Sequence, residues 1–232
     1  MLGALPDAEY LRLEPHFEHV ALASGQCIVE PALPITHVFF PTEGIVSLIA
    51  ELSGDTSIEI AIIGNEGMIS TTLLLEGLRA SSPMRRSVVQ IAGHAYRVRA
   101  EILLAEFERG GKLRQWLLRF TQALITQIAQ IAVCSRHHAV EAQLSRWLMQ
   151  RLDRLKTAEI YVTHKEIATL LGVRREGVTE AACDLQEAGL IRYSRGHVEM
   201  LDREGLRKKS CECLGVIQKE YARLLGVLTP DR

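Results

Sequence analysis

Hydrophobic and polar positions follow two periods along the chain, a strand-like one in the first part and a helical one in the second. From about residue 19 to 98, short runs rich in valine, isoleucine and phenylalanine are separated by glycines at positions 25, 44, 54, 64 and 93. Such runs between glycine turns are typical of short antiparallel strands, and none has the pattern of a βαβ unit. We therefore predict an antiparallel β-roll or barrel, interrupted by one short helix within residues 71–87.

The pattern changes after Ala100, and residues 112–137 contain neither glycine nor proline. Apolar positions there recur at alternating spacings of four and three, which is the heptad seam of a coiled coil. The seam consists of Leu113, Leu117, Phe120, Leu124, Gln127, Ile131 and Cys134, and a second apolar face carries Leu118, Ile125, Ile128 and Ala132. We predict that this helix packs on its own barrel and also forms a parallel homodimer. A helix buried only within its own domain is the alternative.

A second amphipathic pattern follows in EAQLSRWLMQRLDRL, residues 141–155, and it breaks at residues 156–159. We place a domain boundary near residues 137–140. The predicted domains are a β-roll sensor domain with the long helix, residues 1–138, and a smaller domain over residues 139–232.

The stretch VTHKEIATLLGVRREGVTEAACDLQEAGLI, residues 162–191, has the local signals of two helices joined by a tight turn. Thr163 and Glu166 have the spacing of a capping box, and Gly172 permits the positive φ of the turn. A second helix then buries Val178, Ala181, Ala182 and Leu185. Its opposite side presents Arg174, Arg175, Glu176, Thr179 and Glu180. This pattern predicts a helix-turn-helix.

The side chains at the start of the second helix suit the edges of DNA bases. Arginine can donate to O6 and N7 of guanine, and a carboxylate can accept from N4 of cytosine. Arg175 and Glu176 together therefore predict contacts to adjacent base pairs in a major groove, whereas an exposed ion pair without function is the alternative. We add Thr163, Lys165 and Arg195 to the candidate DNA contacts.

Two short alternating runs surround Ser194, Arg195 and Gly196, which is a hairpin signal. The hairpin would make a wing beside the two helices, with Arg192, Arg195 and His197 near phosphates. The tail REGLRKKSCECLGVIQKEYARLL, residues 203–225, predicts one more amphipathic helix.

Composition is that of an ordinary globular protein, with 47% hydrophobic and 24% charged residues. The formal net charge is −1, so no basic excess indicates nucleic acid, although the balance differs along the chain. Residues 139–232 carry 16 Lys and Arg against 14 Asp and Glu, and residues 1–138 carry 11 against 14. The start has no export-signal pattern and no run approaches about 20 apolar residues. Five cysteines, an odd number, suit free thiols in a cytoplasmic protein.

Metal and catalytic patterns are weak. Cys134 and His138, four residues apart on one helix, have a spacing that permits a shared metal. Cys211 and Cys213 are two apart on a predicted helix, which points them to different faces. A seam cysteine and exposed histidines are the ordinary explanation, so we predict no metal and no cofactor. The chain has no nucleophile elbow, phosphate loop or GxGxxG motif, so we do not expect an enzyme.

The order of these parts, with THKEIATLLGVRREGVTEAACDLQEAGLI and a wing after a long helix, resembles the Crp/Fnr family of bacterial transcription regulators up to about Asp202. The resemblance implies an α+β fold with a cyclic-nucleotide-binding-like β-roll, a dimerisation helix over residues 112–137 and a winged helix-turn-helix. Arg175 and Glu176 match the arginine and glutamate that begin the family's recognition helix. Arg174 replaces the serine before that pair, and Glu180 stands where the best-known member has another arginine. The base preference of that member is therefore not implied.

Ligand recognition departs further from the family pattern. Cyclic-nucleotide binders have Gly-Glu followed about ten residues later by Arg-Ser or Arg-Thr. Here Asn65 separates Gly64 from Glu66, and Arg86 and Ser87 come 22 residues after Gly64. Glu66, Arg86 and Ser87 are thus the ligand candidates, and cyclic AMP is not the expected effector. An oxygen-sensing iron–sulfur cluster is not expected either, because Cys27 is the sole cysteine near the N-terminus.

The predicted partners are double-stranded DNA, a second copy of the chain, RNA polymerase as a further candidate and a small-molecule effector of unknown identity. No membrane partner is predicted. The alternative function is a cyclic-nucleotide-responsive binding protein or regulatory subunit whose winged helix docks a protein. An arginine and glutamate at the mouth of the second helix favour DNA, since a protein-docking helix does not need them.

Overall fold

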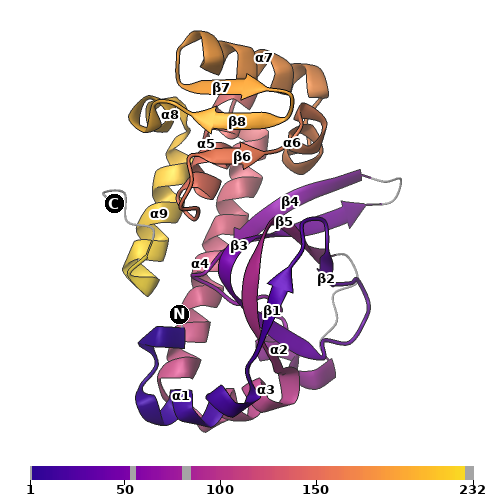
Figure 1. The fold of residues 1–232 in the computed structure, drawn as a ribbon, viewed down its shortest axis with the longest axis vertical. Coiled ribbons are helices and arrows are strands. Elements are labelled where there is room, and N and C mark those ends of the chain that lie inside the picture. The colour runs from indigo at the N-terminus through magenta and orange to yellow at the C-terminus, as the bar shows by residue number, and fades with distance from the viewer. Residues whose placement is uncertain (1, 53–55, 80–84, 228–232) are drawn as a thin grey trace.

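Helix α4 (Gly111–His137) runs along the length of the molecule in the computed structural model, which describes residues 2–52, 56–79 and 85–227 (Figure 1). A β-domain lies beside one part of α4, and a smaller domain of helices and three strands lies at its C-terminal end (Figure 1). The last helix turns back alongside α4, and the first α-helix also contacts it.

The β-domain is an antiparallel sheet in the order β1-β5-β3-β4, with β2 paired to β5. This arrangement agrees with the predicted antiparallel β-roll. Its strands are β1 (Glu18–Leu22), β2 (Cys27–Val29), β3 (His37–Leu52), β4 (Thr56–Ile63) and β5 (Arg85–Arg99). Its helical segments are η1 (Leu2–Ala4), α1 (Asp7–Leu13), η2 (Glu14–His16), α2 (Leu73–Glu76), η3 (Gly77–Arg79) and α3 (Ala100–Arg109).

Two of the predicted glycine turns are bulges inside long strands instead. Gly44 lies within β3 with φ +84°, and Gly93 lies opposite it within β5. A Cβ atom on Gly93 would lie 2.2 Å from the carbonyl oxygen of Glu43, so only glycine allows the two backbones to approach this closely. The pairing register shifts on both sides of Glu43, which bends the sheet without ending a strand. The prediction for Gly54 lies outside the described residues.

The heptad seam of α4 faces the core of its own chain. All seven seam residues, Leu113, Leu117, Phe120, Leu124, Gln127, Ile131 and Cys134, are buried. The alternative of burial within the chain therefore holds for the seam. The second apolar face is the exposed one: Leu118 is 44% and Ile125 is 53% exposed. Among the described helices, α4 is long and apolar enough to cross a membrane, but its apolar seam is packed against the β-domain.

Gln127 is the polar position of the seam, and its amide is fully used within the chain. Its Nε2 donates to the carbonyl of Ile62, at 3.1 Å, and to the hydroxyl of Tyr221, at 2.9 Å. Gln127 therefore joins α4 to β4 and to the last helix.

The smaller domain contains a three-stranded sheet in the order β6-β8-β7 and five helices among the described residues. Its elements are α5 (Val140–Leu152), β6 (Glu159–Tyr161), α6 (His164–Leu171), α7 (Arg175–Glu187), β7 (Ile191–Ser194), β8 (His197–Met200), α8 (Arg203–Lys209) and α9 (Glu212–Leu225). The strand β6 occupies part of the segment that we predicted as a break.

The predicted single helix of the tail is two helices, α8 and α9. Ser210 and Cys211 have extended backbones with ψ of 150° and 162°, which ends one helix before the next begins. After this break α9 runs back along α4, and its Ile217 and Tyr221 join the hydrophobic core of the β-domain. The break thus gives the tail a role in joining the two parts of the chain.

Helix α5 is buried on all sides and is not amphipathic as predicted, because it lies between the β-domain, α7, α8 and α9. Arg151 in α5 and Arg154, two residues after the helix ends, reach acidic residues of the β-domain. Arg151 pairs with Glu59 at 2.5 Å, and Arg154 pairs with Glu66 at 2.7 Å. All four side chains are at most 4% exposed, so these are buried ion pairs between the two domains.

Candidate nucleic-acid interface

Helix α6 begins with the predicted capping box. The Oγ1 atom of Thr163 accepts from the backbone N–H of Glu166 at 3.2 Å, and the carboxylate of Glu166 accepts from the N–H of Thr163 at 2.7 Å. The helix ends at Gly172, which has φ +68°. Both local predictions are confirmed, and together they fix the turn between α6 and α7.

Helix α7 has one buried and one exposed side, as the spacing predicts. Val178, Ala181, Ala182 and Leu185 are buried against the rest of the domain. The five outward positions, Arg174, Arg175, Glu176, Thr179 and Glu180, are all exposed. Arg174 is the N-cap and the helix begins at Arg175. The arginine and glutamate therefore project from the first turn of a well-anchored helix.

A histidine and a tyrosine that we did not predict support this surface. The Nδ1 atom of His164 lies 3.0 Å from Oγ1 of Thr179, and the hydroxyl of Thr179 donates to the carbonyl of Arg175. The ring of His164 stacks on Tyr193 of β7 with centroids 4.1 Å apart. Burial, with the positive charge of Arg175, lowers the pKa of His164 below its ordinary value, so the ring is neutral at pH 7. His164 thereby links α6, α7 and the wing without adding charge.

The wing is the predicted hairpin of β7 and β8. Its turn contains Arg195 with φ +48° and Gly196 with φ +80°. Arg195 is exposed at the tip, whereas Arg192 pairs with Glu199 at 2.5 Å. The third phosphate candidate, His197, lies 3.2 Å from a carboxylate oxygen of Glu159. Arg192 and His197 each have a carboxylate partner in these two pairs, and Arg195 belongs to neither pair.

Thr163 and Lys165 have different surroundings from the α7 residues. They line a cavity of about 520 Å³ between α6 and the β-domain, together with Ser47, Arg86 and Gln90. Helix α6 also packs on β4, and a Cβ atom on Gly172 would lie 3.1 Å from the side chain of Ile58. In this arrangement Thr163 and Lys165 face the β-domain, while the start of α7 faces outward.

The comparisons with known proteins agree with this geometry. Residues 142–209 match the family model of the Crp-like helix-turn-helix domain. The chain has the fold of a Crp/Fnr-type transcription regulator. None of the curated proteins matches the chain.

Three solved structures show how far the Crp/Fnr-type fold extends. FixK2 from Bradyrhizobium japonicum is 14% identical with a TM-score of 0.70, and the match covers 84% of this chain and 98% of that one. The c-di-GMP responsive global regulator CLP from Xanthomonas campestris is 14% identical with a TM-score of 0.66, covering 84% and 99%. TTHA1359, a CRP/FNR family regulator from Thermus thermophilus, is 17% identical with a TM-score of 0.66, covering 83% and 98%. The likeness is one of fold, over more than four fifths of this chain and nearly the whole length of the other three.

The three ligand candidates have separate surroundings. The carboxylate of Glu66 is paired with Arg154 and is 1% exposed. Arg86 pairs with Glu51 at 2.8 Å and lines the cavity beside α6. Ser87 is buried and lines a different cavity, of about 30 Å³. The structure therefore does not bring these side chains together around one ligand-sized space.

The cysteines that we predicted to point to different faces converge instead. Cys211 and Cys213 lie beside Cys134 and His138 at the junction of the two domains. Because Cys211 is the N-cap of α9 and is extended, the helical spacing rule does not apply to the pair. A hydrogen bond with Cys211 and the positive charge of Arg146 lower the pKa of the Cys134 thiol to about 5. These four residues are the described group that could hold a metal, and sequence spacing alone did not connect them.

Proposed function

We propose that this chain is a cytoplasmic, dimeric regulator that binds a specific inverted repeat in double-stranded DNA through α7. One observation carries the proposal: Arg174 is exposed at the N-cap of α7 and Arg175 and Glu176 on its first turn, within a Crp-like helix-turn-helix domain. Long polar side chains at the start of the second helix are the groups that reach base edges in this motif. We propose no catalytic activity.

The proposed roles differ along the surface. Arg175 donates to guanine and Glu176 accepts from cytosine, so the two specify adjacent base pairs. Thr179 and Glu180, on the next turn, face the same groove. Arg174, outside the helix, and Arg195, at the wing tip, contact phosphates and position the domain.

The proposed dimer uses the exposed face of α4. Leu118, Ile125 and Ala132 are seven residues apart, and all three are exposed. Ile128 is half-buried between them. A heptad repeat of apolar residues exposed to water favours pairing with the same face of a second copy. Two copies paired in parallel would place their α7 helices in successive major grooves, with half-sites about 10 bp apart.

The effector is proposed to differ from cyclic AMP, because Glu66, Arg86 and Ser87 do not share a cavity. Glu66 is instead part of the joint between the β-domain and α5. An effector acts in this scheme by binding one arrangement of the two domains more tightly than the other.

Two neighbouring arginines provide a test with an internal control. Replacing Arg175 by alanine should weaken binding to the cognate site by about 1–3 kcal/mol and relax the preference at one base pair. Replacing Arg174 by alanine should weaken binding to all sequences alike and reduce the salt dependence by about one counterion. Fluorescence anisotropy with cognate and single-mismatch duplexes at several salt concentrations measures both effects. Equal weakening of all sequences by Arg175→Ala would make that residue a phosphate contact and contradict its proposed role.

A further inference from the structure

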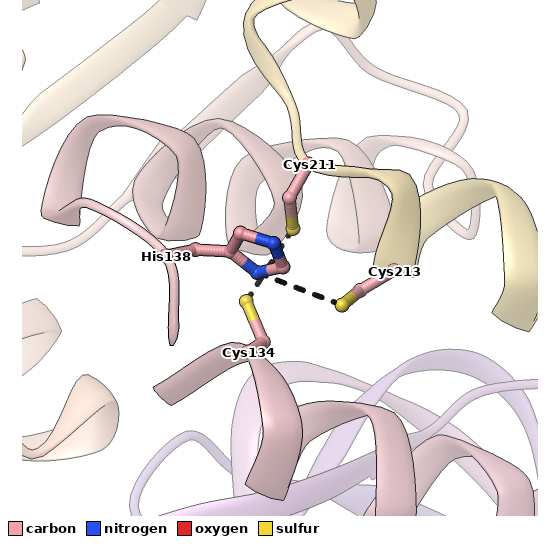
Figure 2. A group of neighbouring side chains, drawn as sticks. All are labelled: Cys134, His138, Cys211 and Cys213. Atoms are coloured by element: carbon pink, nitrogen blue, oxygen red, sulfur yellow. Dashed lines mark hydrogen bonds between the residues drawn. The ribbon is translucent and has the colours of Figure 1, made fainter. Parts of the chain in front are cut away.

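Four potential metal ligands meet where α4 ends and α9 begins. Cys134 lies in the last turn of α4, His138 is the C-cap of that helix, Cys211 is the N-cap of α9, and Cys213 lies in its first turn. Figure 2 shows the three thiols and the imidazole ring pointing toward one another. The four ligand atoms all lie within 4.8 Å of one another.

The spacing of these atoms is close to that of a tetrahedral zinc site. The Sγ atoms of Cys134 and Cys211 are 3.4 Å apart, and the Sγ of Cys213 is 3.7 Å from Nδ1 of His138. With Zn–S bonds of about 2.3 Å and Zn–N bonds of about 2.0 Å, tetrahedral ligand atoms are separated by about 3.5–3.8 Å. Because all four atoms lie within 4.8 Å of one another, shifts of at most about 1 Å would complete the site. A single ion fits this spacing, whereas a multi-iron cluster needs ligands farther apart.

The groups around the four residues are those that support metal ligands. The Nε2 atom of His138 lies 3.2 Å from the carboxylate of Glu212, which leaves Nδ1 directed at the thiols. A carboxylate on the outer nitrogen orients a metal-binding histidine and raises its basicity. Arg146, which is 3% exposed, donates from Nε to the Sγ of Cys134 at 3.2 Å. Three thiolates and one divalent ion leave a charge of about −1, and the guanidinium of Arg146 offsets it.

We propose that Cys134, His138, Cys211 and Cys213 bind one Zn²⁺ ion, which fastens α9 to the junction of α4 and α5. Thiolate and imidazole ligands favour zinc, and four protein ligands make a closed, structural site without a position for substrate. Binding forms three Zn–S bonds and one Zn–N bond and releases to solvent any protons that the thiols still hold, with no change in oxidation state. The ligands come from residues 134–138 and 211–213, so the ion closes a long loop that contains the whole helix-turn-helix. This inference does not depend on the proposed DNA sequence specificity.

The test uses the full-length protein purified under reducing conditions. Its zinc content is measured first, and its absorption spectrum is recorded after exchange of zinc for Co²⁺. We expect about one zinc per chain and the visible and near-ultraviolet bands of a tetrahedral cobalt–thiolate site. Cys213→Ser should weaken zinc binding by at least about 100-fold in competition with a chromophoric chelator, because a direct ligand is lost. The matched control is Cys183→Ser, which removes an exposed thiol of α7 and should leave zinc binding unchanged.

A second variant keeps the test decisive if Cys213→Ser fails to fold. Glu212→Gln retains all four ligands and removes the carboxylate from His138, so it should weaken zinc binding by about 10–100-fold. The proposal is overturned if the wild-type protein shows no cobalt–thiolate bands, or if Cys213→Ser binds zinc as tightly as Cys183→Ser. It is also overturned if the reduced, purified protein contains a disulfide between Cys134 and Cys211 by mass spectrometry in place of zinc.

Discussion

Replacing Arg151 by methionine is expected to lower the free energy of unfolding by about 3–5 kcal/mol, because it leaves the buried carboxylate of Glu59 without its cation. Arg151 is fully buried, and its Nη2 atom lies 2.5 Å from Glu59, which is 4% exposed. Burial lowers the pKa of Arg151 to about 10, so the guanidinium is still charged at pH 7. Ser47 also donates to the Glu59 carboxylate, but a neutral hydroxyl does not replace a positive charge.

Urea denaturation of a double-mutant cycle measures this effect. Arg151→Met combined with Glu59→Leu should recover much of the loss, because no buried charge then remains unpaired. The control is Arg192→Met, since the Arg192–Glu199 pair in the wing is largely exposed and its loss should change stability by less than about 1 kcal/mol. Two results would contradict a stabilising role for this buried ion pair: a loss of unfolding free energy below about 1 kcal/mol for Arg151→Met, or a double variant whose loss equals the sum of the two single losses.

The ion pair of Arg151 and Glu59 also joins the two domains. Glu59 belongs to β4 and Arg151 to α5, and the neighbouring pair of Glu66 and Arg154 spans the same joint. Both pairs therefore hold the helix-turn-helix domain in one arrangement against the β-domain. An effector that shifts this arrangement has to compete with two buried ion pairs, so its binding has to favour the other arrangement strongly.

Replacing Ile125 by glutamate is expected to make the protein monomeric and to weaken binding to an inverted repeat by about 100-fold or more. In a parallel pair of α4 helices, residues of one heptad position face their own copies, so two buried carboxylates would repel each other. Ile125 lies in the middle of the exposed face, between Leu118 and Ala132. A monomer keeps its contacts to one half-site and loses the gain from binding both together.

Light scattering and anisotropy on the same samples measure mass and DNA affinity. The control is Leu75→Glu, which makes the same kind of change at a 70% exposed position of α2, away from α4. It should leave both mass and affinity unchanged. A dimeric Ile125→Glu variant that binds DNA normally would show that the exposed face of α4 is not the interface.

The helix-turn-helix could be predicted because its signals are local. The capping box of Thr163, the positive φ of Gly172 and the apolar spacing of α7 each depend on residues a few positions apart. The bulges at Gly44 and Gly93 could not be predicted from the sequence, because glycine suits both a turn and a bulge. Only the pairing with the facing strand decides between the two. The support that His164 gives to Thr179 likewise needs the folded contact of two helices.

Two features could not be predicted because they depend on long-range packing: which face of α4 is buried, and the meeting of Cys134, His138, Cys211 and Cys213. A four-and-three spacing marks an apolar stripe, but it does not say whether the stripe meets the chain's own sheet or a partner. The seam from Leu113 to Cys134 is buried inside the chain, because the β-domain and α9 cover it. Cys134 and Cys211 are 77 residues apart and meet because α9 turns back along α4. The charges of α5 are buried for the same reason, since neighbours on every side supply their partners.

The most direct test of the central claim is selection of bound sequences from a randomised duplex pool at a stated salt concentration, with and without cyclic AMP. We predict enrichment of an inverted repeat without cyclic AMP, with half-sites about 10 bp apart, and loss of preference at one base pair in each half-site for Arg175→Ala. Recovery of no repeat under either condition, or of a repeat that Arg175→Ala leaves unchanged, would contradict the claim that α7 recognises a specific DNA sequence.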